Sequence, residues 1–161
     1  MVSKSTGRVD WVLLAYRLPR EPSTPRIAVW RRLRRLGAAQ LLDGLVALPL
    51  DPRNRERFDW LAGEIVEAGG EAAVWHGTLA GRRQERELVA AMAAVVAAEY
   101  ENLIEEAEGL GAASPGARRR SLARLRRELR RIQDRDYFPT AARERAERAV
   151  DELAGLVEEP V

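Results

Sequence analysis

The chain has 161 residues, contains no cysteine and only one histidine, and carries a formal net charge of +2. A chain of this length folds as one domain, or as a small domain with an extension, and buries a substantial apolar core. The composition excludes disulfides, thiol nucleophiles and zinc-finger sites, and we expect neither a metal ion nor another cofactor.

The charge is unevenly distributed along the chain. Residues 1–40 carry nine basic and two acidic side chains, whereas residues 41–116 carry six basic and fourteen acidic ones. Residues 117–161 are basic again, with twelve basic and nine acidic side chains. Such asymmetry is typical of a basic face for an anion or nucleic acid, or of pairing with an acidic patch, and it does not distinguish between them.

The first predicted element is a buried strand at residues 9–18, where β-branched, aromatic and aliphatic side chains run together until Pro19. A helix follows, with Thr24 as its predicted N-cap and Pro25 in its first turn, where a missing N–H group costs nothing. Apolar residues then recur at helical spacing until Gly37, which is expected to end the helix.

Two short apolar segments follow and predict a β-hairpin. They are joined by Asp43 and Gly44, which favour the positive φ angles of a two-residue turn. Asp51 and Pro52 repeat the combination of cap and proline and predict a second helix. A fourth strand is predicted at residues 71–79.

The order of these elements is β-α-β-β-α-β, which predicts an α+β fold with a ferredoxin-like sandwich over residues 9–79. Residues 82–159 show helical apolar spacing throughout and predict an α-helical C-terminal extension. This extension has too many apolar positions to stand alone, so we expect it to pack on the sheet or on a second subunit.

The four tryptophans are expected to pack in the core, because each lies in an apolar predicted element. They are Trp11, Trp30, Trp60 and Trp75.

Several stretches of the chain resemble the N-terminal domain of the ChrB family of chromate-resistance regulatory proteins. The most specific is "YRLPREPSTPRIAVWRRLRRLGA", followed by "LLDGLVALP" and "FDWLAGEIVEAGGEA". The later pieces "EYENLIEEAE" and "RRIQDRDYFP" resemble the helical end of the same domain, so the resemblance covers residues 9–155. The element order also resembles the middle domain of the phenylacetate-type repressors and, more distantly, the Cas2 nuclease fold, in both cases as an analogy of fold.

The resemblance implies a DNA-binding transcriptional regulator of a chromate efflux operon, with promoter DNA as its partner. Longer members of the family add a C-terminal domain associated with chromate sensing, which the present sequence does not contain. We therefore expect a separately encoded chromate-sensing protein as a second partner, and a homodimer. The alternative is a non-catalytic interaction module whose arginines pair with an acidic partner surface.

Three arginines lie around the junction between the first strand and the first helix. Arg17 and Arg20 flank the end of the strand, and Arg26 lies in the first turn of the helix. Free N–H groups at a helix start favour an anion, and a guanidinium suits a phosphate or an oxyanion such as chromate. We predict that these residues bind such an anion; the alternative is a solvated loop in which Arg20 pairs with Glu21.

A denser arginine group follows on the first helix, away from its apolar face. Arg31 and Arg35 are four residues apart, a like-charge pairing that destabilises a helix unless an anion or acidic group lies over it. No acidic residue occurs between residues 22 and 42, so this partner is not local. We predict DNA phosphates over Arg31, Arg32 and Arg35; the alternatives are the acidic helix at residues 82–110, or solvent.

No catalytic motif is present, and we do not expect an enzyme. The sequence contains no P-loop, dinucleotide fingerprint or Ser/His/Asp set. Where the Cas2 fold places a metal-binding aspartate, this chain has Tyr16 and Arg17. No apolar run approaches a membrane span and no signal peptide is recognised, so we expect a cytoplasmic protein.

Overall fold

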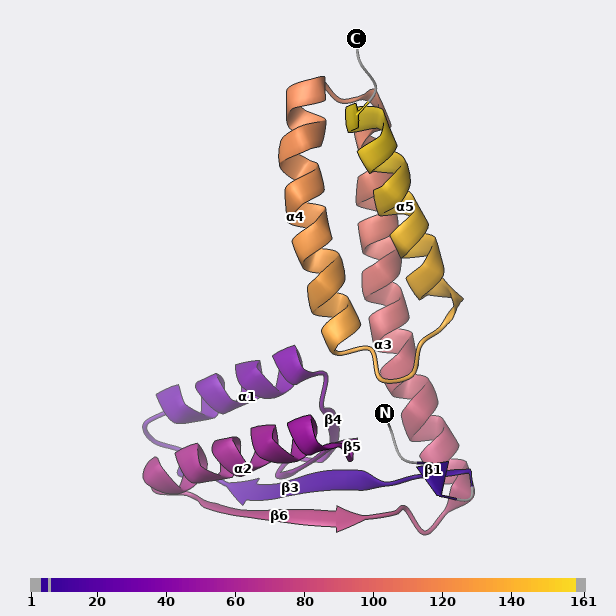
Figure 1. Ribbon diagram of the computed structural model, residues 1–161. Coiled ribbons are helices and arrows are strands. Elements are labelled where there is room, and N and C mark those ends of the chain that lie inside the picture. The colour runs from indigo at the N-terminus through magenta and orange to yellow at the C-terminus, as the bar shows by residue number, and fades with distance from the viewer. Residues whose placement is uncertain (1–3, 6, 159–161) are drawn as a thin grey trace. The chain divides into compact units, whose positions relative to one another are not determined.

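The computed structural model describes residues 4–5 and 7–158 (Figure 1). Among these residues a mixed α+β fold is present, which confirms the predicted class. The chain divides into two compact units between Leu88 and Val89. The elements in chain order are β1 (Lys4–Ser5), β2 (Arg8–Val9), β3 (Trp11–Arg17), α1 (Thr24–Leu36), β4 (Ala39–Leu42), β5 (Leu45–Pro49), α2 (Pro52–Glu67), β6 (Glu71–Gly77), α3 (Arg82–Gly109), the 3-10 turn η1 (Leu110–Ala112), α4 (Pro115–Asp134) and α5 (Ala141–Glu158).

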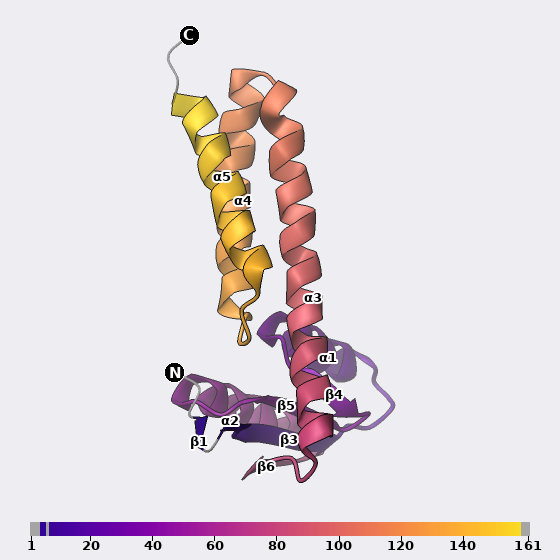
Figure 2. The same ribbon diagram turned by 90° about the vertical axis from the view of Figure 1, so that its right-hand side faces the viewer.

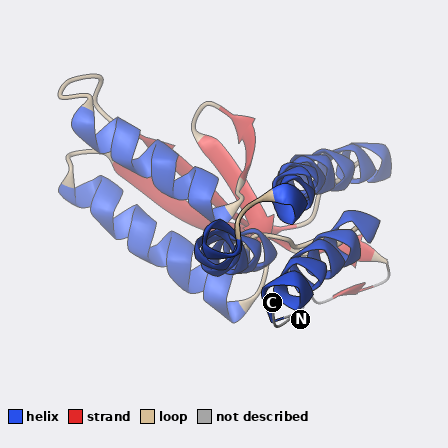
Figure 3. Ribbon diagram, turned by 90° about the horizontal axis from the view of Figure 1, so that it is seen from above, coloured by secondary structure: helices blue, strands red, loops and turns tan. Residues whose placement is uncertain are grey.

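The first unit is built on a four-stranded sheet in the order β4-β5-β3-β6, in which every neighbouring pair is antiparallel. The helices α1 and α2 lie side by side over one face of this sheet (Figures 1 and 3). Val12 and Leu14 of the central strand β3 are completely buried, and so are Phe58 and Ile65 of α2. The two-stranded ribbon β1–β2, which the sequence did not predict, precedes β3.

The caps of the two sheet-covering helices follow the predictions in part. Gly37 ends α1 with a φ of 73°, as expected for a left-handed C-terminal glycine. Asp51 caps α2 by accepting the N–H group of Asn54 at 2.7 Å. The prediction of Thr24 as N-cap is wrong, because the cap residue is Ser23, whose side chain makes no capping hydrogen bond. Pro25 alone marks this helix start.

The turn between β4 and β5 lies where it was predicted, but Gly44 serves a different purpose. Its φ is not in the left-handed region, where only Gly7, Gly37 and Gly69 lie among the described glycines. Instead, a Cβ at Gly44 would collide with the carbonyl oxygen of Tyr16. The N–H group of Tyr16 donates to the Gly44 carbonyl at 2.8 Å, so the turn lies directly against the end of β3.

Glu85 attaches the first turn of α3 to the sheet. Its buried carboxylate accepts the backbone N–H group of Val9 at 3.0 Å and the indole N–H group of Trp11 at 3.4 Å. It also forms an ion pair with Arg8 across 3.3 Å. One arginine and two N–H donors from the strands therefore compensate this carboxylate, which is how a buried charge is normally tolerated.

The second unit is a helical bundle formed by the remainder of α3 with α4 and α5 (Figure 2). Its core contains Tyr100, Leu125, Ile132 and Ala146, each at most 1% exposed. The predicted helical extension is therefore helical as far as it is described; its last residue, 159, lies outside the described residues. Every helix in the described part of the chain is too short or too polar to span a membrane.

The acidic face of α3 pairs with arginines of its own bundle. Carboxylates of α3 form ion pairs with arginines of α4, α5 and the segment that follows α4. The pairs are Glu99 with Arg135, Glu101 with Arg145, and Glu106 with Arg124. These three carboxylates are therefore already engaged in ion pairs within the second unit.

The prediction that all four tryptophans pack in the core is wrong for three of them. Trp11 is buried, but Trp30, Trp60 and Trp75 are 48%, 65% and 61% exposed. Trp60 lies on α2 away from the buried Phe58 and Leu61. Trp75 pairs with Leu13 in the sheet, so it points away from the face that carries Val12 and Leu14. An apolar neighbourhood in sequence did not reveal which face each indole occupies.

Candidate functional site

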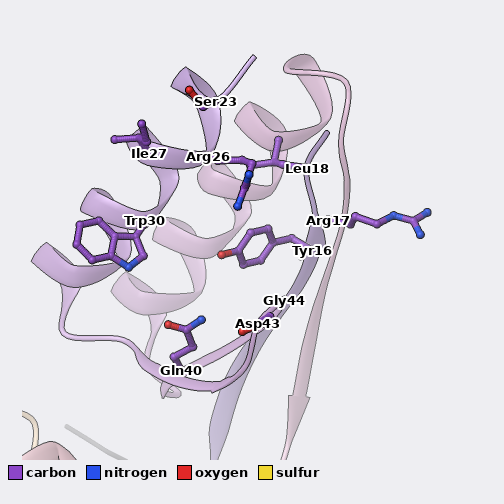
Figure 4. Close-up of a pocket in the computed structure, with 10 residues that line it drawn as sticks. All are labelled: Tyr16, Arg17, Leu18, Ser23, Arg26, Ile27, Trp30, Gln40, Asp43 and Gly44. Carbon is purple, nitrogen blue, oxygen red and sulfur yellow. The ribbon is translucent and has the colours of Figure 1, made fainter. Parts of the chain in front are cut away.

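An open pocket of about 720 Å³ lies in the first unit, where α1, the end of β3 and the β4–β5 turn meet. This volume is within the range of small-molecule sites. Figure 4 shows the side chains around it. The lining residues are Tyr16, Arg17, Leu18, Ser23, Arg26, Ile27, Trp30, Gln40, Asp43 and Gly44.

Tyr16 lies at the centre of this pocket, with its hydroxyl directed into the space between Arg26, Trp30 and Gln40 (Figure 4). Burial raises the pKa of Tyr16; the charge of Arg26 lowers this pKa and that of Asp43 raises it. The phenol is therefore protonated at neutral pH and supplies a neutral hydroxyl. Because Gly44 fixes the β4–β5 turn against the end of β3, Asp43 is held in the same pocket as this phenol.

One wall of the pocket is the half-exposed indole of Trp30. The guanidinium of Arg34, one turn later on α1, lies 4.9 Å from the centroid of this ring. This is the geometry of a cation–π contact, which holds the indole in place although it is open to solvent. The pocket therefore offers an oriented aromatic surface.

Arg26 is the predicted anion-binding residue that the structure places in the pocket. Arg17 borders the pocket with its backbone, but its side chain points away from it (Figure 4) and forms an ion pair with Glu71 at 2.6 Å. Arg20 lies exposed in the loop before α1. The structure therefore does not gather Arg17, Arg20 and Arg26 around one anion.

The arginines further along α1 fall into two groups. Arg32 forms an ion pair with Glu64 of α2 at 2.5 Å, so it connects the two helices. Arg31 and Arg35 are exposed, and no carboxylate in the described part of the first unit pairs with either. The predicted like-charge pair is therefore open to an external anion.

Only Arg17 and Arg26 of the lining residues were predicted to bind a ligand. Asp43 and Gly44 were predicted only as a turn and Trp30 as core, and no role was predicted for Tyr16 or Gln40. The available signal was the turn itself, but a hairpin pattern does not state which strand end it lies against. No group of three or more acidic or histidine side chains in the described part of the chain could hold a metal ion.

Comparison with known proteins gives the family. Residues 26–113 match the family model described as Protein ChrB, N-terminal. The chain is also 30% identical over 147 residues to Protein ChrB of Cupriavidus metallidurans. That alignment covers 89% of this chain and 45% of the relative, so the chain spans less than half of the relative's length. No solved structure matches. The family match includes Arg26, Arg31, Arg32 and Arg35, and by this match the chain belongs to the family of the ChrB N-terminal domain.

Proposed function

We propose that the protein is a DNA-binding transcriptional regulator of chromate resistance that contacts phosphates through the arginines of α1. Membership of the ChrB N-terminal family supports the regulatory role in chromate resistance at the level of the family. The observation that carries the DNA-binding part is the exposed pair Arg31 and Arg35. These residues lie one turn apart, and no carboxylate in the described part of their own unit is paired with either.

The physical reason is that two like charges at this spacing destabilise a helix until an anion lies over both. A DNA backbone supplies such anions at regular intervals, and guanidinium groups bind phosphate through two parallel hydrogen bonds. Arg20 and Arg26 extend the basic surface toward the start of the helix. Arg17 and Arg32 would first have to release Glu71 and Glu64, so we assign them a smaller part. The proposed regulator is not an enzyme.

A second candidate is an interaction module in which the same arginines pair with an acidic protein surface. It is favoured by the ion pairs between α3 and the arginines of the second unit, because they show that this chain joins helices through Arg–Glu contacts. A homodimer and a separate chromate-sensing protein are the proposed protein partners. Light scattering of the purified chain, alone and with the sensing protein, tests both.

The DNA-binding proposal is tested by a salt titration with the promoter upstream of the gene. We expect saturable binding whose logarithm falls linearly with the logarithm of salt concentration. Each phosphate contact contributes about 0.9 to that slope, so Arg31→Ala/Arg35→Ala should reduce it by roughly 2. The matched control is Arg53→Ala/Arg55→Ala, which removes the same charge from exposed positions on α2 of the same unit.

The control variant should keep nearly the wild-type slope. Equal losses in both variants would mean that only the overall charge matters, and the assignment to α1 would be wrong. Absence of any duplex binding at low salt would refute the DNA-binding proposal and leave the interaction module, which should then form a defined complex with an acidic protein.

We also propose the ferredoxin-like classification of the sheet unit. The element order β3-α1-β4-β5-α2-β6 and the two helices on one face support it. An experimental structure compared with known ferredoxin-like folds would test this assignment.

A further inference from the structure

We infer that the pocket beside α1 is a nucleotide-binding site, in which a nucleobase stacks on Trp30 and a phosphate lies at Arg26. This inference goes beyond the proposed contact with duplex phosphates and does not depend on it. It rests on the combination of an aromatic wall, a single inward cation, and polar groups that line the same space.

The aromatic wall is the first argument. Trp30 is 48% exposed and, unlike the exposed Trp60 and Trp75, lines this pocket, so its ring is accessible to a ligand there. Arg34 covers one side of the ring at 4.9 Å and thereby fixes its plane. A nucleobase can stack on the opposite face of this ring, in the way that bases stack on the aromatic side chains of proteins that bind single-stranded nucleic acids.

The polar groups of the pocket are the second argument. Gln40 supplies an amide with donors and an acceptor, Asp43 supplies acceptors, and Tyr16 supplies a neutral hydroxyl (Figure 4). A nucleobase edge presents both N–H donors and ring or carbonyl acceptors, so it can use each of these groups. A purely apolar ring would make no hydrogen bond to any of these groups.

The charge of the pocket separates a nucleotide from a compact oxyanion. The carboxylate of Asp43 lines the same space as Arg26 and offsets its charge, which disfavours a small dianion between them. A nucleotide avoids this conflict, because its phosphate and its base are separated by the sugar. The phosphate then lies at Arg26 and Ser23, near the amino end of α1, and the base extends toward Gln40 and Asp43.

The test is an NMR titration of the full chain labelled with ¹⁵N, following the four indole N–H signals. The probes are the four deoxynucleoside 5′-monophosphates, a mixed hexanucleotide, and deoxyribose 5-phosphate as a probe without a base. We expect saturable shifts of the Trp30 signal with at least one mononucleotide or with the hexanucleotide, and none with deoxyribose 5-phosphate. The Trp60 signal, from a similarly exposed indole on α2, should not move.

Substitutions decide whether the pocket itself is responsible. Trp30→Ala should weaken binding between about 5-fold and about 150-fold, the range found for loss of one base–aromatic stack. Trp60→Ala is the matched control and should leave binding unchanged. Gln40→Ala, at an exposed position of an edge strand, should weaken binding as well and does not depend on the stability of α1.

The outcomes identify the source of the nucleotide and separate this inference from the DNA-binding proposal. Tighter binding of the hexanucleotide indicates a single-stranded segment of nucleic acid, and tighter binding of a mononucleotide indicates a free effector; both support the inference. No saturable shift with any probe, or equal affinity in Trp30→Ala and wild type, would overturn it. In that case, duplex binding that depends on Arg31 and Arg35 would still support the DNA-binding proposal. Conversely, nucleotide binding at Trp30 without any duplex binding would support the nucleotide site and refute the DNA-binding proposal.

Discussion

Tyr100 and Tyr16 show how the same type of side chain serves different purposes at two places in this chain. Tyr100 is completely buried in the helical bundle and donates its hydroxyl proton to Asp136 at 2.8 Å. The Asp136 side chain is itself 2% exposed and has Arg143 at 3.7 Å. Tyr16 lies half-buried in the pocket and makes no hydrogen bond through its hydroxyl within the described structure. The first tyrosine stabilises a fold, and the second is free to meet a ligand.

Tyr100→Phe should lower the free energy of unfolding of the bundle by about 1.5–3 kcal/mol, because it removes a hydrogen bond to a buried carboxylate. Urea denaturation followed by circular dichroism at 222 nm measures this loss. Tyr16→Phe is the control and should change stability by less than about 0.5 kcal/mol. Equal effects of the two substitutions would contradict the buried contact.

The same contact predicts a dependence on pH. Burial and the bond to Asp136 raise the pKa of Tyr100 well above its ordinary value, so the folded state keeps its proton while the unfolded state releases one above about pH 10. The contribution of the Tyr100 hydroxyl to the free energy of unfolding is therefore fully present below about pH 10 and decreases as the pH rises further. Tyr100→Phe should flatten this alkaline decrease.

Among the elements, the β4–β5 turn does most to shape the pocket. Its position depends on the close approach of Gly44 to the carbonyl of Tyr16, which leaves no room for a side chain. The turn carries Asp43, and the strand before it carries Gln40, so a displaced turn would move both groups away from Tyr16.

Gly44→Ala should destabilise the first unit by about 1–3 kcal/mol, the usual cost of forcing extra atoms into a packed site. The matched control is Gly63→Ala within α2, where a Cβ meets open space. Because alanine is the better helix former, that variant should gain about 0.5–1 kcal/mol. Urea denaturation followed by tryptophan fluorescence measures both, and a stable Gly44→Ala protein would contradict the close approach.

The elements themselves could largely be predicted from the sequence, because periodicity, proline and glycine act locally. Asp51 and Gly37 were correctly predicted as cap and stop, and the helical spacing of residues 82–158 gave helices. The pocket could not be predicted in this way. It depends on which strand end lies under the β4–β5 turn and on which side of α1 Trp30 faces, and both are set by tertiary packing.

At the scale of the whole molecule, different spectroscopic signals report on the two compact units. All four tryptophans precede residue 89, whereas most of the long helices follow it. Tryptophan fluorescence therefore follows the sheet unit, and circular dichroism at 222 nm is dominated by the bundle. Each unit has buried residues of its own, so each has a basis for separate unfolding.

We accordingly predict that the two signals give different urea midpoints. Tyr100→Phe should shift the circular dichroism transition and leave the fluorescence transition in place. Coincident curves that shift together would mean that the chain unfolds as a single cooperative unit, contrary to this prediction.

The order of the sheet also has a consequence for handling the protein. Both outer strands have one side unpaired among the described residues, but they are not equivalent. Strand β4 is short and its pairing is irregular between Gln40 and Leu42, which makes it a poor template for another chain. Strand β6 is longer, regular, and contains neither proline nor lysine. Intermolecular strand pairing, and hence aggregation during overexpression or refolding, should begin at β6.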